Sequence, residues 1–101
     1  MDHHSDLRVL TIVAEAVIES RLLHELDVCG ARGWTVTDAR GRGPRDRRTG
    51  DIAGGNIRIE SVVTPDVMQR IVDRLKADYF PSYACVAWAT SVIVSRTDHF
   101  T

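Results

Sequence analysis

The stretch Asn56-Ile57-Arg58-Ile59-Glu60-Ser61-Val62-Val63-Thr64-Pro65-Asp66 decides the fold class. Every second residue from 57 to 63 belongs to one face, with Arg58 and Glu60 on the opposite face, and this alternation predicts a half-buried strand. Thr64 suits a helix N-cap, Pro65 suits the first helical position, and Asp66 suits the positively polarised first turn. The stretch therefore predicts a strand that leads directly into a helix.

Downstream of this stretch, the apolar pattern changes twice. Met68, Ile71, Val72 and Leu75 recur at helical spacing, and Pro81 cannot continue a helix, so we expect the helix to end by Tyr79. The run 84–94 is then almost continuously apolar. A strand that is covered on both faces has this character.

The N-terminal half repeats the same order. Residues 7–14 are rich in Val, Leu and Ile and predict a buried strand, and 18–29 predict an amphipathic helix that ends at Gly30. Residues 34–37 predict a second strand. The order β-α-β-loop-β-α-β is typical of the ferredoxin-like α+β fold, a four-stranded antiparallel sheet with two helices on one face. We expect the other face to meet the sheets of neighbouring subunits.

Length and composition indicate one domain, 1–101, with a flexible N-terminus at 1–6. The net charge of −1 gives no overall field that would favour nucleic acid or a membrane surface. Residues 1–6 lack the apolar segment of a signal peptide, and no apolar run approaches the ~20 residues of a spanning helix. Cys29 and Cys85 fit reduced, mostly buried thiols. These features predict a cytoplasmic protein.

The segment 40–55 has no apolar periodicity and predicts a long loop. It holds five arginines between Arg40 and Arg48, and five glycines. Glycine allows close backbone approach and arginine offers a bidentate fork, so the loop suits a phosphate group that would order it. A solvated flexible loop fits the composition equally well. An RNA-binding segment fits less well, because aromatic residues are missing from the loop.

Other reactive side chains do not form a recognisable site. The four histidines lack metal-ligand spacing, and no nucleophile–base motif is evident. Glu15 and Glu60 are interpreted as solvated charges, and Trp34 and Trp88 as core or interface residues. We therefore expect no catalytic residue, no metal and no covalently bound cofactor.

The chain resembles the PII signalling superfamily, and most of all its SbtB-type members, which are associated with bicarbonate transport and carboxysomes. Four stretches, in this order and spacing, carry the resemblance: 30–36 (GARGWTV), 41–45 (GRGPR), 56–60 (NIRIE) and 78–84 (DYFPSYA). The resemblance implies a homotrimeric ferredoxin-like fold in which 40–55 is the T-loop.

The resemblance also implies an adenine nucleotide, AMP, ADP, ATP or cyclic AMP, in the cleft between subunits. Arg45 and Arg48 match the positions that meet the phosphate. The full set that matches nucleotide-binding positions is Gly41, Arg42, Gly43, Arg45, Arg48, Asn56, Tyr83, Ala84, Cys85 and Val86. The implied role is regulation of a partner, such as a bicarbonate or other membrane transporter, through which the protein would reach the membrane.

Three departures from the family pattern limit what is implied. Cys85 stands where SbtB-type proteins usually have glycine, and 78–84 replace the lysine-containing phosphate loop of other PII proteins. The redox-active cysteine tail of some SbtB-type proteins is not expected here. Two rival interpretations use the same fold: a small acylphosphatase-like enzyme and a metal-tolerance trimer of the CutA kind.

Overall fold

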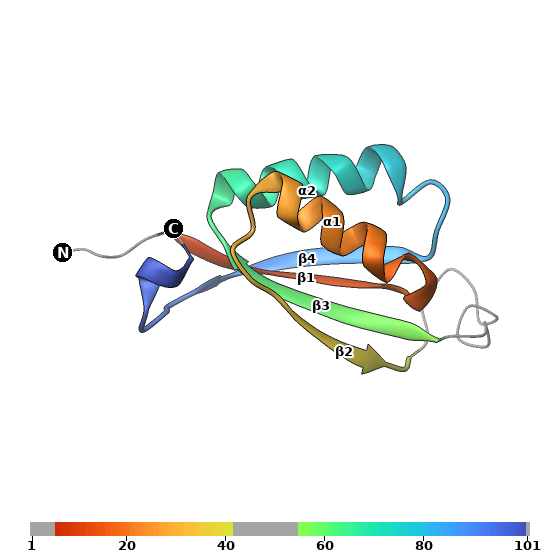
Figure 1. The fold of residues 1–101 in the computed structure, drawn as a ribbon, viewed down its shortest axis with the longest axis horizontal. Helices are drawn as coiled ribbons and strands as arrows, with labels where there is room; N and C mark the ends of the chain where they lie inside the picture. Colours follow the sequence, from red (N-terminus) through yellow and green to blue (C-terminus); the bar gives the residue numbers. More distant parts are fainter. Residues whose placement is uncertain (1–5, 42–54, 101) are drawn as a thin grey trace.

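The computed structural model describes residues 6–41 and 55–100. Two strand–helix–strand units follow one another along the chain, which gives a four-stranded sheet with both helices on one face (Figure 1). The principal elements are β1 (Leu7–Glu15), α1 (Glu19–Cys29), β2 (Thr35–Ala39), β3 (Asn56–Val63), α2 (Pro65–Asp78) and β4 (Cys85–Val92), with short 3-10 turns at Ala16–Ile18 and Thr97–His99.

The strand order is β2-β3-β1-β4, and all three strand pairings are antiparallel. The fold is therefore the ferredoxin-like α+β fold that the sequence predicts. Register is fixed near the middle of the sheet, where Ile12 of β1 lies opposite Ile59 of β3 and Ala87 of β4. A slip of one residue would turn these side chains away from the helices, so the helix layer fixes the register.

The core lies between the sheet and the two helices. Its members come from the inward faces of β1 and β3, from the apolar stripes of α1 and α2, and from residues directly beside the two helices. They are Leu10, Ile12, Ala14, Ile18, Leu22, Leu26, Cys29, Ala31, Ile57, Ile59, Val63, Ile71, Leu75 and Tyr79. The predicted alternation in β3 is confirmed, because Ile57, Ile59, Ser61 and Val63 are all buried.

Helix α1 ends as predicted at Gly30, whose φ of 106° lies in the left-handed region. Replacing Gly30 with alanine should lower the free energy of unfolding by about 1–2 kcal/mol, because a Cβ strains this backbone conformation. Gly33→Ala is the matched control, since an added Cβ there would meet no atom within 4 Å. Chemical denaturation checks both variants, and equal stability of Gly30→Ala and the parent chain would contradict the prediction.

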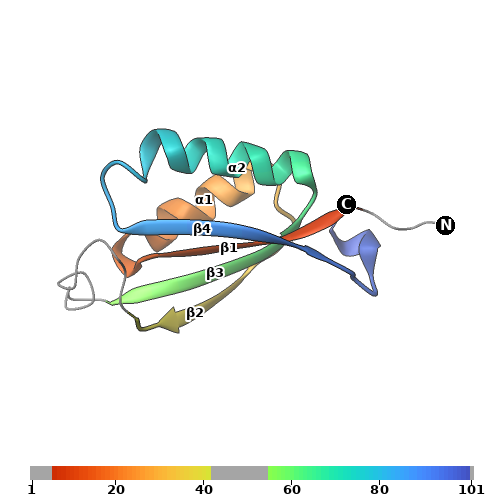
Figure 2. The ribbon, with the colours of Figure 1, turned by 180° about the vertical axis from the view of Figure 1, so that it is seen from behind.

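The last strand differs from its sequence-based description. It spans Cys85–Val92, which is shorter than the apolar run, and most of its residues are exposed within one chain. Trp34 and Trp88 are not core residues, with 38% and 45% of their surface exposed. Figure 2 shows the sheet from behind, and Figures 1 and 2 together show α1 and α2 on the same face of it. Among the described residues, neither helix has the length and apolar character that crossing a bilayer requires.

Candidate functional site

Residues of β1, β2 and β3 and the residue before β4 form one row at one end of the sheet. Asn56, the first residue of β3, lies opposite both Ala39 of β2 and Glu15 of β1. The Glu15 amide in turn donates to the Ala84 carbonyl at 3.3 Å, immediately before β4. Gly41 lies two residues beyond Ala39. The row Ala39–Asn56–Glu15–Ala84 therefore brings three separate parts of the predicted site to the same sheet end.

Glu15 is not the solvated charge that the sequence suggests. Its Oε2 accepts a hydrogen bond from the Ala84 amide at 2.8 Å. Strand β1 ends at Glu15, and the Ala16 amide donates to the Gly55 carbonyl at 2.9 Å. The Glu15 carboxylate thus accepts from the Ala84 amide, where a backbone carbonyl of β1 would be the acceptor in regular strand pairing. Glu60 does fit the interpretation as a solvated charge, because it forms an exposed ion pair with Arg58 at 3.2 Å.

The turn between α2 and β4 is held from the helix side by Arg21. The Arg21 Nη1 donates to the Tyr83 hydroxyl at 2.7 Å. Its guanidinium carbon lies 5.4 Å from the centre of the Tyr79 ring and 5.5 Å from that of Tyr83. The hydrogen bond to Tyr83, followed by the field of that residue, raises the pKa of Arg21. Arg21 therefore places a permanent positive charge beside the turn.

Cys85 directs its side chain into the helix layer. Its register partner is Ala14, a core residue, and Cys85 itself packs against the core. Burial, with a smaller contribution from the charge of Glu15, raises the pKa of the Cys85 thiol to about 11. The thiol is therefore neutral at physiological pH, and the neutral form is a poor nucleophile. The next residue, Val86, pairs with Val13 on the open face and is 51% exposed.

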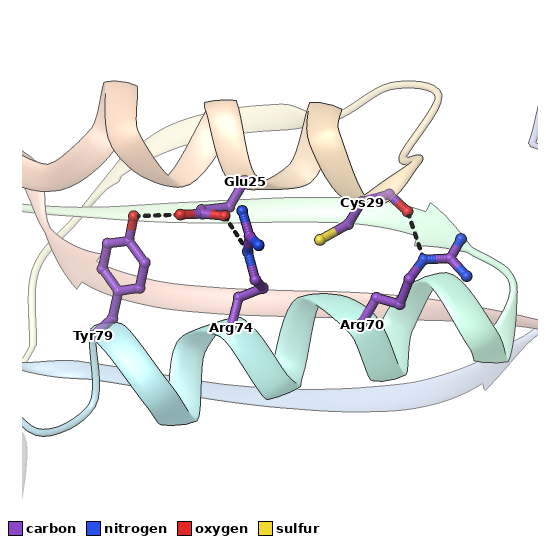
Figure 3. Close-up of polar contacts among 5 residues, drawn as sticks. All are labelled: Glu25, Cys29, Arg70, Arg74 and Tyr79. Carbon is purple, nitrogen blue, oxygen red and sulfur yellow. Dashed lines mark hydrogen bonds and ion pairs between the residues drawn. The ribbon is translucent and has the colours of Figure 1, made fainter.

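A buried carboxylate joins the two helices (Figure 3). Glu25 of α1 accepts from Arg74 Nε at 2.6 Å and from the Tyr79 hydroxyl at 2.9 Å. Burial would raise the pKa of Glu25, but the hydrogen bonds from Arg74 and Tyr79 outweigh it, and the pKa is lowered. Farther along, Arg70 Nε donates to the Cys29 carbonyl at the end of α1, at 3.1 Å. Tyr79 is thus fixed at the start of the turn that leads to Tyr83.

The structure brings together part of the predicted nucleotide set. Gly41, Asn56, Tyr83, Ala84, Cys85 and Val86 all lie at or next to the sheet end described above. Arg42, Gly43, Arg45 and Arg48 lie outside the described residues. Sequence reasoning missed Glu15 and Arg21 as neighbours of this turn. Within residues 6–41 and 55–100, no group of three or more His, Cys, Asp or Glu is placed to bind a metal.

Comparison with known proteins identifies the family. The model of the family described as Nitrogen regulatory protein P-II matches residues 7–99. The chain belongs to the P-II family. Residues 7–99 run from the first residue of β1 to the turn after β4, so the whole ferredoxin-like unit lies inside the match.

Solved structures of P-II relatives share the fold. A PII-like signalling protein from Thermus thermophilus is 44% identical, with a TM-score of 0.81, and the match covers 94% of this chain and 95% of that one. CPII from Thiomonas intermedia, bound to ADP and bicarbonate, has a TM-score of 0.83 at 21% identity, with 94% of both chains covered. GlnK from B. subtilis, in complex with ATP, has a TM-score of 0.64 at 16% identity, covering 88% of this chain and 86% of that one.

Proposed function

We propose that this P-II family chain is a single-domain signalling protein that binds an adenine nucleotide between the subunits of a homotrimer. AMP, ADP, ATP and cyclic AMP are the candidate ligands. The binding state is passed to a partner protein in the cytoplasm, and no reaction is catalysed. The proposal rests on the row of residues at the sheet end. In this row Asn56 and Ala84 lie on either side of Glu15, and Ala39 leads on to Gly41.

The chemistry of this edge suits a nucleotide. Arg45 and Arg48 lie in sequence between Gly41 and Gly55, the described residues on either side of them, and both of these residues are next to the row. Arginine forks match phosphate oxygens two at a time. Tyr83, Ala84 and the exposed Val86 lie at the same end of the sheet. The relatives strengthen the proposal, since CPII binds ADP and B. subtilis GlnK binds ATP.

Calorimetric titration tests the proposed ligand class. We expect at least one of the four adenine nucleotides to bind with one site per subunit at micromolar to sub-millimolar concentration. Binding of none of them at millimolar concentration would remove the nucleotide-sensor proposal. Acetyl phosphate hydrolysis is the parallel assay for the acylphosphatase-like rival, and a metal titration is the assay for the CutA-like rival.

The open sheet face is the surface on which we expect subunits to meet. Val86 and Trp88 are 51% and 45% exposed there, and Ile93, just beyond β4, is 99% exposed. A cavity of about 350 Å³ lies at the far end of this face, lined in part by Val9, Val62 and Phe100. Val86 and Trp88 lie two residues apart on the same face of β4, and exposed apolar side chains grouped in this way mark an interaction site. One chain alone would leave this surface in water.

Val86→Glu should weaken trimer assembly at least tenfold, because a carboxylate at the interface would be desolvated without a partner. Val28→Glu is the matched control. Val28 is 55% exposed on α1, away from the sheet, so this variant should remain trimeric. Light scattering at micromolar concentration measures the mass of each. A monomeric parent chain would contradict the trimer, and a trimeric Val86→Glu would contradict this choice of interface.

The identity of the regulated partner is the most specific part of the proposal. A bicarbonate or other membrane transporter is suggested by the resemblance to SbtB-type proteins. The loop that starts after Gly41 would present a different surface when its arginines hold a phosphate, which is how a ligand biases a two-state element. Co-purification with the candidate transporter, with and without ADP, tests this step. Equal recovery in both conditions would count against nucleotide control of the partner.

A further inference from the structure

Opposite charges flank the turn before β4. Arg21 of α1 binds the Tyr83 hydroxyl on one side, and Glu15 of β1 binds the Ala84 amide on the other. Tyr83 and Ala84 are adjacent in sequence. The turn therefore has a cation beside Tyr83 and an anion beside Ala84. Both residues belong to the set proposed to line the nucleotide.

The Glu15 carboxylate is held in place by the sheet. Glu15 is the last residue of the central strand β1, and its backbone faces Asn56 of β3 on one side. On the other side its amide donates to the Ala84 carbonyl at 3.3 Å, while its Oε2 accepts from the Ala84 amide at 2.8 Å. Two contacts to the same residue fix both the position of the carboxylate and the conformation of the turn.

The Ala84 amide is the kind of donor that phosphate-binding turns use. Backbone N–H groups that converge on a turn or a helix start bind phosphate because they present positive partial charge without bulk. Here an internal carboxylate already occupies that donor. A phosphate group that approached it would have to displace Glu15 or lie beside a like charge, and both are unfavourable.

The same carboxylate is a good acceptor for other parts of a nucleotide. A carboxylate oxygen accepts hydrogen bonds from hydroxyl and amino groups, and a nucleoside offers both on its ribose and its adenine ring. The Glu15 edge of the turn thus suits the nucleoside.

We propose that Glu15 is a specificity-determining residue: its carboxylate keeps the outer phosphates of a nucleotide away from the Ala84 amide, and the site consequently prefers adenine nucleotides with few phosphates. This inference rests on the proposed nucleotide function. It concerns the ratio of affinities between nucleotides, whereas the proposed function concerns whether any of them binds.

Glu15→Gln separates this role from a purely structural one. The amide oxygen of glutamine can still accept from the Ala84 amide, so the turn retains its hydrogen bond while the negative charge is lost. Asp27→Asn is the matched control, because Asp27 is exposed near the other end of α1 and its change alters the net charge equally. Thermal unfolding establishes that both variants remain folded.

Calorimetric titration with AMP and with ATP, without Mg²⁺ and at fixed salt, measures the ratio of the two affinities, which decides the question. The parent chain should bind AMP more tightly than ATP. Glu15→Gln should improve ATP affinity relative to AMP by about tenfold, the scale of one charged hydrogen bond, and Asp27→Asn should leave the ratio unchanged.

Three results would overturn the inference. If the parent chain and Glu15→Gln have the same AMP-to-ATP ratio, or if Asp27→Asn shifts it equally, Glu15 does not set specificity and the proposed function stands. If the parent chain binds neither these nucleotides nor ADP or cyclic AMP, the inference falls together with the proposed function.

Discussion

Glu25→Ala should lower the free energy of unfolding by about 2–3 kcal/mol at neutral pH. Tyr79 is only 3% exposed, so its hydroxyl would lose its acceptor without gaining bulk water. Arg74 would lose the partner that it binds at 2.6 Å. Chemical denaturation at one fixed protein concentration measures the change, because assembly adds to the apparent stability of an oligomer. Unchanged stability would show that the network does not join the helices.

Acid should remove the same contribution in the parent chain. The pKa of Glu25 is lower in the fold than its usual value of 4.5, so the folded state favours the carboxylate. The stabilisation is complete above the unfolded-state pKa and is lost as the pH falls through the folded-state pKa. The stability gap between the parent chain and Glu25→Gln should therefore be full at neutral pH and shrink below about pH 4.5. A gap that is constant down to about pH 3 would contradict the assignment.

Arg45→Ala should weaken adenine-nucleotide binding by about tenfold to a hundredfold. A hydrogen bond to a charged group contributes about 1.5–3 kcal/mol, and about 1.4 kcal/mol corresponds to one decade of affinity. Arg48→Ala should behave similarly. Arg45→Lys should recover only part of the loss, because an ammonium group offers a point charge where the guanidinium offers a bidentate fork. Calorimetric titration with ADP measures all three variants.

The control for these variants is an exposed cation elsewhere. Lys76 is exposed on α2, so Lys76→Ala removes the same charge at a distance from the sheet row. Arg70 is less suitable, since its Nε binds the Cys29 carbonyl. If Arg45→Ala and Arg48→Ala bind ADP as the parent chain does, the phosphate contacts lie elsewhere and the nucleotide proposal itself remains.

Local sequence signals predicted most of the fold. Three of these signals each depend on only a few neighbouring residues: the alternation in 57–63, the helix start at Thr64-Pro65-Asp66 and the helix end at Gly30. The structure has the expected strand, helix start or helix end at each place. The cap is one partial exception, because the Thr64 side chain forms no capping hydrogen bond with the helix backbone. The apolar run of the last strand was less informative, since its composition does not reveal whether one chain or its neighbours cover it.

The contacts of the candidate site were harder to predict because they join distant parts of the chain. Glu15 and Ala84 are 69 residues apart, and Arg21 and Tyr83 are 62 apart. Within its own helix, strand or turn, none of these residues has a sequence pattern that marks it as a contact residue. Strand β1 ends at Glu15, so the Ala84 amide needs an acceptor other than a carbonyl of a continuing strand. Only a search for that acceptor would have pointed to the Glu15 side chain. That question depends on the strand order, which the motif spacing alone does not provide.

Hydrogen exchange with and without saturating ADP tests the central claim most directly. If an adenine nucleotide binds at the sheet end formed by Asn56, Glu15 and Ala84, the amides of 55–57 and 83–86 should gain protection. The junction of α1 and α2 near Cys29 and Arg70 should exchange at the same rate in both states. Saturating ADP that leaves 55–57 and 83–86 unchanged would contradict the account.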